Sequence, residues 1–344
     1  MRNAIERVEA ILERSTGERT CSSPLQTATL ELMGLADTYW PQAHSDPEMM
    51  ARLSAAAHEF GGIPSLRIPF DICVEAEAIG CEVRMGRADT PPSIMNPAFT
   101  EFDELRIPNL VQERGRIPTL LRATRLLSGR YGNSIPIFTM IVGPMTLLGF
   151  LVGIEKTLYT LSTQPQALEN ALDTIAQFNV DFANALVDEG SDFVLVADPV
   201  ASGDLVAAEH FARYVLPLYQ RIRRQLKVRA ILHICGNTNP FLRYLPETGF
   251  EAFSFHGPEV EVKVARRIIG DRMALVGNLP SATLLRYSTP TIIQARSLKA
   301  LQDGVDILAP ACGFHPHTPL ANMKAMVRAV DKYESRADFS DKET

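Results

Sequence analysis

The stretch SDFVLVADPVASGDLVAAEHFARYVLPLYQRIRRQLKVRAILHICGN (residues 191–237) contains the pattern of a strand, a helix and a second strand. Its two nearly continuous apolar runs, 192–197 and 229–234, are typical of parallel strands covered on both faces. Between them, residues 207–226 carry apolar side chains at helical spacing. The stretch therefore predicts a β-α-β unit of a parallel sheet.

The same alternation recurs from about residue 60 onward. The expected strands are residues 65–70, 82–85, 137–142, 192–197, 229–234, 251–255, 273–276 and 305–309. The expected helices include residues 165–189, 207–226, 260–269, 289–302 and 320–333. Eight strands alternating with helices predict an α/β fold, a single (β/α)8 barrel of the TIM type. A doubly wound open sheet is the alternative, but no glycine-rich dinucleotide fingerprint follows the first expected strand.

No low-complexity linker divides the chain, so we expect one domain. Residues 1–60 are expected to form a helical N-terminal extension that begins with an amphipathic helix, residues 61–335 the barrel, and residues 336–344 a flexible tail. Residues 134–154 carry no charge. Because prolines and glycines interrupt them, they predict a buried strand, a turn and an apolar helix start rather than a membrane span.

Composition excludes several classes of function. The chain has 344 residues, of which 46% are hydrophobic and 22% charged, as in a globular protein with a sizeable core. A net charge of -6 argues against nucleic acid as a partner, and the lack of a long basic run argues against a membrane surface. Five cysteines, an odd number, and no export signal predict reduced thiols in the cytoplasm.

Polar side chains follow most of the expected strands at the point where each strand ends. In a parallel barrel these positions converge on the carboxyl-terminal face, where such folds place their active sites. The residues at these positions are Asp71, Asp198, His233, Cys235, His256, Asn278 and Cys312.

His233 and Cys235 alternate along one strand end, so both side chains can point to the same side. Together with Cys312 they would offer an imidazole and two thiolates, which are good zinc donors, and three ligands would leave an open, catalytic position. The alternative is a pair of small buried cysteines and a hydrogen-bonded histidine. Gly236 and Gly313 follow the two cysteines and permit tight turns.

The chain resembles the uroporphyrinogen decarboxylase superfamily, specifically its methylcobamide:coenzyme M methyltransferase branch. The motifs that carry the resemblance are RIPFDICVEAEAIGCEV (67–83), GPMTLLGFLVG (143–153), LVADPVASGDL (195–205), LHICGNTNP (232–240), LVGNLPSATLL (275–285) and GVDILAPACGFHPHTPLANMKAMV (304–327). The resemblance implies that zinc is bound by His233, Cys235 and Cys312. It also directs attention to Glu75 and Glu77 as a possible fourth ligand, with Glu77 preferred.

The resemblance implies zinc-dependent transfer of a methyl group from a methylated corrinoid to a thiol such as coenzyme M. We expect the corrinoid to arrive on a separate protein, because the chain has no convincing D-x-H-x-x-G motif. Substrate contacts or support of the ligands are expected from Asp198, Asn237, His256 and Asn278; for Asp198, capping of the turn that follows it is equally compatible. A sulfonate would need a basic partner, and the sequence does not rank Arg84, Arg87, Arg243 and Arg286.

Three other functions remain open from the sequence. Related enzymes load a corrinoid protein from a methyl donor, which is the opposite direction of transfer. Decarboxylases of the superfamily carry an arginine motif near the N-terminus, and the corresponding residues 20–34, TCSSPLQTATLELMG, contain no arginine. Porphyrinogen decarboxylation is therefore disfavoured. A non-catalytic barrel with vestigial residues is the third alternative.

Overall fold

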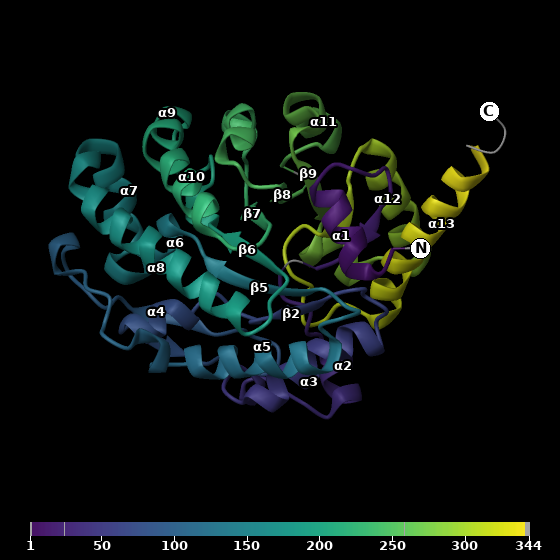
Figure 1. Cartoon of the computed structure of the whole chain (residues 1–344), viewed down its shortest axis with the longest axis horizontal. Coiled ribbons are helices and arrows are strands. Elements are labelled where there is room, and N and C mark those ends of the chain that lie inside the picture. Colours follow the sequence, from purple (N-terminus) through teal and green to yellow (C-terminus); the bar gives the residue numbers. More distant parts are fainter. Residues whose placement is uncertain (1, 24, 258, 341–344) are drawn as a thin grey trace.

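The structure is a computed structural model that describes residues 2–23, 25–257 and 259–340. Its main feature is an eight-stranded sheet with the strand order β1-β10-β9-β8-β7-β6-β5-β2, in which all neighbouring strands run parallel. The sheet curls, and helices surround it (Figure 1). The predicted (β/α)8 barrel is therefore confirmed.

Most strands are short and completely buried. The strands of the barrel are β1 (Thr20–Cys21), β2 (Leu66–Ile68), β5 (Ile137–Val142), β6 (Phe193–Ala197), β7 (Ala230–Ile234), β8 (Ala252–Phe255), β9 (Ala274–Leu279) and β10 (Ile307–Pro310). A separate antiparallel hairpin consists of β3 (Glu82–Arg84) and β4 (Ser93–Asn96).

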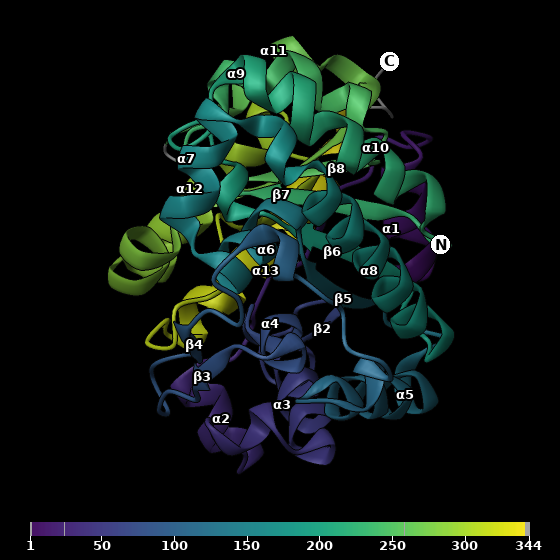
Figure 2. The same cartoon turned by 90° about the vertical axis from the view of Figure 1, so that its left-hand side faces the viewer.

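The expected barrel strand at residues 82–85 is wrong. It forms the β3–β4 hairpin, which Figure 2 shows at the lower left, apart from the sheet. Glu82 and Arg84 are exposed, so the segment lacks the apolar surface that a barrel strand buries. The eighth strand is instead β1, from residues 1–60, which we expected to be helical; two residues are too few to show a periodicity.

The two end strands of the sheet, β1 and β2, approach one another through side chains. Ser22, directly after β1, and Ser65, directly before β2, are both buried, and their hydroxyl oxygens are 2.9 Å apart. This hydrogen bond links the first and last strands of the sheet order. Residues 1–60 thus supply part of the barrel wall as well as helices.

The barrel interior is apolar at the amino-terminal ends of the strands. Phe138 of β5 and Phe193 of β6 stack there, with ring centroids 5.0 Å apart. Ile11 and Leu12 of α1 (Ala4–Leu12) are buried in the same cluster. The predicted N-terminal amphipathic helix therefore closes this end of the barrel, which leaves the carboxyl-terminal mouth for chemistry.

The helices follow the predicted alternation closely. They are α1, α2 (Leu30–Ala36), α3 (Pro47–Glu59), α4 (Val74–Ile79), α5 (Ile117–Tyr131), α6 (Pro144–Val152), α7 (Ile154–Thr163), α8 (Glu169–Asp188), α9 (Ala208–His210), α10 (Leu216–Gln225), α11 (Val262–Ile269), α12 (Pro290–Asp303) and α13 (Leu320–Ser340). A π-helical turn, Phe211–Val215, joins α9 to α10.

The uncharged stretch 134–154 forms β5, a turn at Gly143, and α6, as predicted. Within the described residues, no helix has the length and apolar character needed to cross a membrane. At the other end of the chain, residues 336–340 of the expected tail continue α13, and residues 341–344 lie outside the described part.

Candidate metal centre

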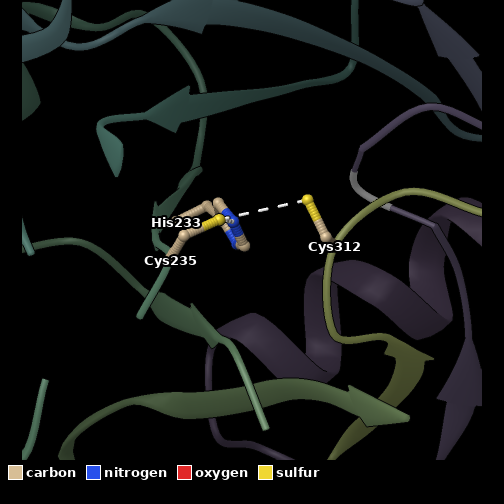
Figure 3. Close-up of side chains that lie close together, drawn as sticks. All are labelled: His233, Cys235 and Cys312. Carbon is tan, nitrogen blue, oxygen red and sulfur yellow. Dashed lines mark hydrogen bonds between the residues drawn. The ribbon is translucent and has the colours of Figure 1, made fainter. Parts of the chain in front are cut away.

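The three predicted metal ligands meet at the carboxyl-terminal mouth of the barrel. His233 lies in β7, Cys235 follows that strand, and Cys312 follows β10. One donor atom from each residue lies within 4.8 Å of the other two. Figure 3 shows Cys312 facing His233 and Cys235 from the opposite side. Because parallel strands end at one face of the barrel, residues 77 positions apart in the sequence become neighbours.

The donor atoms have separations that suit a zinc ion. The two sulfur atoms are 3.9 Å apart, close to the roughly 3.8 Å expected for two thiolates on a tetrahedral zinc ion. His233 Nε2 lies 3.0 Å from Cys235 Sγ, and this pair would have to separate to about 3.6 Å around the ion. An imidazole and two thiolates are donors that zinc prefers. The residues therefore fit the metal.

Ser254 of β8 orients the histidine. His233 pairs in register with Ser254, and His233 Nδ1 lies 2.9 Å from its hydroxyl oxygen. If Nδ1 donates to Ser254, Nε2 keeps its lone pair for a metal, as is usual for histidine ligands. The sequence analysis missed Ser254. Ser254 could have been noticed in the sequence as the single polar residue inside the apolar run AFSF (252–255).

The hydrogen bond between the two cysteines makes one thiol easier to ionise than the other. The hydrogen bond from Cys235 holds the pKa of the Cys312 thiol well below its usual range, and the interaction with His233 lowers it further. The same bond to Cys312, together with burial, raises the pKa of Cys235. Cys312 is thus the sulfur more readily ionised before a metal binds.

Gly236 forms the turn that carries Cys235 away from β7. Its φ of +72° lies in the left-handed region, which favours glycine. A Cβ at this position would lie 2.5 Å from Ser202 Oγ and would also clash with Asp204. Asp204 in turn accepts a hydrogen bond of 2.8 Å from the backbone N–H of Asn237. The turn after β7 therefore requires a residue without a side chain.

Gly313 has a different reason to be glycine. A Cβ there would lie 2.8 Å from the carbonyl oxygen and 2.9 Å from the nitrogen of Gln26. The next residue, Phe314, donates a 2.9 Å backbone hydrogen bond to Gln26. The segment after β1 thus packs directly against the loop that carries Cys312.

Comparison with known proteins identifies the family. The model of the uroporphyrinogen decarboxylase (URO-D) family matches residues 3–333. The chain belongs to the URO-D family. It is 36% identical over 312 residues to the methylcobamide:CoM methyltransferase MtaA of Methanosarcina barkeri. The aligned residues cover 90% of this chain and 92% of that protein.

Two further relatives come from Methanosarcina mazei. A methylated-thiol–coenzyme M methyltransferase is 35% identical over 323 residues, which cover 92% of this chain and 87% of that protein. A solved structure described as a methyltransferase superimposes with a TM-score of 0.94 at 35% identity, covering 97% of this chain and 100% of that one. These similarities confirm the resemblance, and this URO-D family member is a methyltransferase.

The acidic residues near the start of α4 have other partners. Asp71 is buried and accepts hydrogen bonds of 2.7 and 3.1 Å from Arg116, which together with His44 hold its pKa well below the usual range despite burial. Glu77 accepts a hydrogen bond of 2.5 Å from Nε of the same arginine. Within the described residues, the ligand group contains His233 and the two cysteines without a carboxylate.

Asp198 supports the site indirectly, by capping α6. Its carboxylate accepts hydrogen bonds from the N–H groups of Met145 and Thr146, the Thr146 hydroxyl and the Tyr219 hydroxyl. Its own N–H donates to the carbonyl of His233, at 2.9 Å. Asp198 therefore caps a helix as its observed role. The helix is α6, earlier in the chain, and not the turn that follows Asp198. Burial raises the pKa of Asp198 to about 6.

The remaining three predicted residues lie at or after strand ends, outside the ligand group. His256 Nδ1 lies 2.6 Å from Glu259 Oε2, and both side chains are partly exposed. Asn278, in β9, donates a 3.4 Å hydrogen bond to the carbonyl of Val260. Asn237 is held by its backbone in the turn after Cys235. Their contacts with a substrate stay a prediction.

Proposed function

We propose that this protein is a zinc-dependent methyltransferase that moves a methyl group from a methylated corrinoid to a thiol such as coenzyme M. The observation that carries the proposal is the His233–Cys235–Cys312 group at the barrel mouth, in a chain more than one-third identical to methylcobamide:CoM methyltransferases. The geometry of these three residues supports a metal site, and the similarity to these relatives supports the reaction.

In the proposed mechanism the three residues hold the metal and transfer no protons themselves. A zinc ion at this position would deprotonate a coordinated thiol near neutral pH. Three protein ligands leave a coordination position for that thiol. Glu77 would have to leave Arg116 to become a fourth ligand. Ser254 keeps the His233 ring oriented, and Asp198 fixes the end of β7 through its backbone.

In the transfer itself, a bond forms between the thiol sulfur and the methyl carbon while the bond between cobalt and carbon breaks. The electron pair of the broken bond stays on cobalt. We propose that the corrinoid is presented by a separate methylated corrinoid protein at the barrel mouth. The two cysteines are half-buried rather than enclosed, which agrees with a donor that approaches from outside.

The decisive experiment follows methylcobalamin consumption by absorbance against a panel of thiols, with and without a zinc chelator. We expect consumption that depends on both protein and thiol, accompanied by formation of the methyl thioether. The chelator should abolish it, and added zinc should restore it.

Cys312→Ala serves as the inactive variant, and Cys81→Ala, a buried cysteine just after the end of α4, as the matched control. Consumption of methylcobalamin without any thiol, or indifference to every thiol tested, would exclude the proposed acceptor. Transfer from a methylated donor to the reduced corrinoid in place of thiol methylation would reverse the proposed direction.

A further inference from the structure

Arg67 is a charged residue inside the barrel. It is the central residue of β2 and pairs in register with Phe138, whose ring belongs to the cluster inside the barrel. Residues paired in a parallel ladder point to the same face, so the Arg67 side chain also starts inward. It is 0% exposed and is one of the large, fully buried side chains of the described residues. The sequence analysis did not single it out among the arginines.

The guanidinium of Arg67 is only partly satisfied by the protein. Nη1 donates a 2.8 Å hydrogen bond to the carbonyl of Ile68, the last residue of β2, so the charged end lies toward the carboxyl-terminal mouth. Nε and Nη2 are buried and have no hydrogen-bond partner among the described residues. The other buried arginine of this region, Arg116, is fully engaged by Asp71 and Glu77.

The two unpartnered groups form one edge of the guanidinium, the edge that grips carboxylates elsewhere in this chain. Arg125 donates through Nε and Nη2 to the two oxygens of Glu189, at 2.5 and 2.6 Å. Arg223 uses the same two nitrogens with Glu251. Such a fork matches two oxygens of an anionic group. Arg67 therefore presents a complete but unused site for an oxyanion.

The buried charge of Arg67 also favours an anion near the metal ligands. Burial lowers the pKa of Arg67 to about 9, and the charges of Cys312 and Glu75 oppose that shift. The guanidinium is still protonated at neutral pH and lies within electrostatic range of Cys312. A buried cation with unpartnered donors destabilises the fold unless an anion or water satisfies them. Glu75 does not occupy the free edge of the guanidinium, because its carboxylate accepts a hydrogen bond from the N–H of Val142 instead.

We propose that Arg67 binds the anionic end of the thiol substrate, a sulfonate or a similar small oxyanion, through Nε and Nη2. The inference rests on the proposed function, since it assigns the second end of a thiol whose sulfur would sit at His233, Cys235 and Cys312. A short thiol with an anionic tail would bridge the two charges. Arg67 is then the residue that selects an anionic thiol over a neutral one.

Direct binding tests the site without any methyl transfer. Titration calorimetry would measure binding of ethanesulfonate, which has no thiol, and of uncharged ethanesulfonamide to the zinc-loaded and zinc-free protein. We expect the wild type to bind the anion and not the amide in both forms. In Arg67→Met the affinity should fall by about 10- to 100-fold, because a charged hydrogen-bonding pair is lost. Arg67→Lys keeps the charge but not the fork and should be intermediate.

Arg122→Met, at an exposed arginine that pairs with Glu48, is the matched control and should bind like the wild type. Equal affinity of wild type and Arg67→Met for ethanesulfonate would overturn the proposal and assign the unpartnered groups to buried water. If Arg67→Met fails to fold, as judged by circular dichroism, the wild type still decides: lack of thermal stabilisation by ethanesulfonate over ethanesulfonamide refutes the anion site.

Kinetics distinguish a substrate contact from a structural role. The ratio of kcat/KM for 2-mercaptoethanesulfonate to that for 2-mercaptoethanol should collapse by about 10- to 100-fold in Arg67→Met, mainly through KM. An equal loss for both thiols would show a structural effect and refute the proposal. If the wild type methylates no thiol, the proposed function fails, while the ethanesulfonate measurement still decides the role of Arg67.

Discussion

At the scale of single residues, zinc content should follow the ligand geometry. We expect about one zinc ion per chain in the wild type and its loss in Cys235→Ala and in Cys312→Ala. Ser254→Ala should keep the ligands but lower zinc affinity by about 10- to 100-fold, because His233 loses the partner that fixes its ring. Metal analysis and competition with a chromogenic chelator measure both effects.

Cys73→Ala provides the control, since this cysteine is buried beside α4 and takes no part in the ligand group. It should retain zinc and its affinity. Full zinc retention in Cys235→Ala and Cys312→Ala would eliminate the ligand set. Unchanged affinity in Ser254→Ala would mean that the barrel walls alone orient His233.

The sequence predicted some site residues and missed others for a physical reason. His233, Cys235 and Cys312 could be found because their strand ends are recognisable and parallel strands share a mouth. Ser254 and Arg67 lie within strands, and a single polar residue in an apolar run shows nothing of its partner across the barrel. Whether Arg67 is paired depends on where Glu75 and Asp71 point, and only the folded structure decides that.

At the scale of elements, long apolar strands and helices were predictable, and short or shared ones were not. β5, β6 and β7 bury every residue, so their apolar runs are unmistakable. β1 has two residues and exists because β10 pairs with it. The segment at 82–85 has strand character but no apolar face to bury, so it forms a hairpin outside the barrel.

The turn after β7 is an element whose geometry can be tested. Gly236→Ala should destabilise the fold by about 1–3 kcal/mol, since alanine at positive φ is strained and its methyl group meets Ser202 and Asp204. It should also lower zinc affinity, because Cys235 precedes the strained residue. Thermal unfolding and chelator competition measure the two effects.

Gly17→Ala is the matched substitution, because a Cβ there would meet nothing within 4 Å. It should leave both the melting temperature and the zinc affinity within error of the wild type. If Gly236→Ala behaved in the same way, the turn would be more adaptable than its contacts with Ser202 and Asp204 indicate.

At the scale of the whole molecule, the barrel separates an apolar floor from a polar mouth. Phe138 and Phe193 fill the floor, and Ile11 and Leu12 of α1 cover it. Towards the mouth, Arg67, Glu75 and the metal ligands lie at the carboxyl ends of β2, β5, β7 and β10. Buried charges lower the stability of the fold, and proteins retain them mainly at functional sites.

The loss of stability caused by a buried charge can be measured at Glu75, as a pH dependence of the free energy of unfolding. Burial raises its pKa in the folded protein to about 7, from an ordinary value of 4.5. The folded state therefore holds the Glu75 proton more tightly than the unfolded state does. The resulting stability is fully present below about pH 4.5 and is lost as pH rises through about 7, a change of about 3 kcal/mol. Glu75→Gln keeps an oxygen for the Val142 N–H and removes this titration.

The difference in melting temperature between wild type and Glu75→Gln isolates this carboxyl from the other titrating groups. The wild type should lose stability relative to the variant as pH rises from about 4.5 to about 7, with the steepest change near pH 6, and the difference should level off at higher pH. Glu31→Gln, at an exposed position of α2, should show a constant difference over the same range. A constant difference for Glu75→Gln as well would mean that Glu75 is ionised in the fold throughout. Its charge would then already be available to offset Arg67, which would weaken the case for an external anion there.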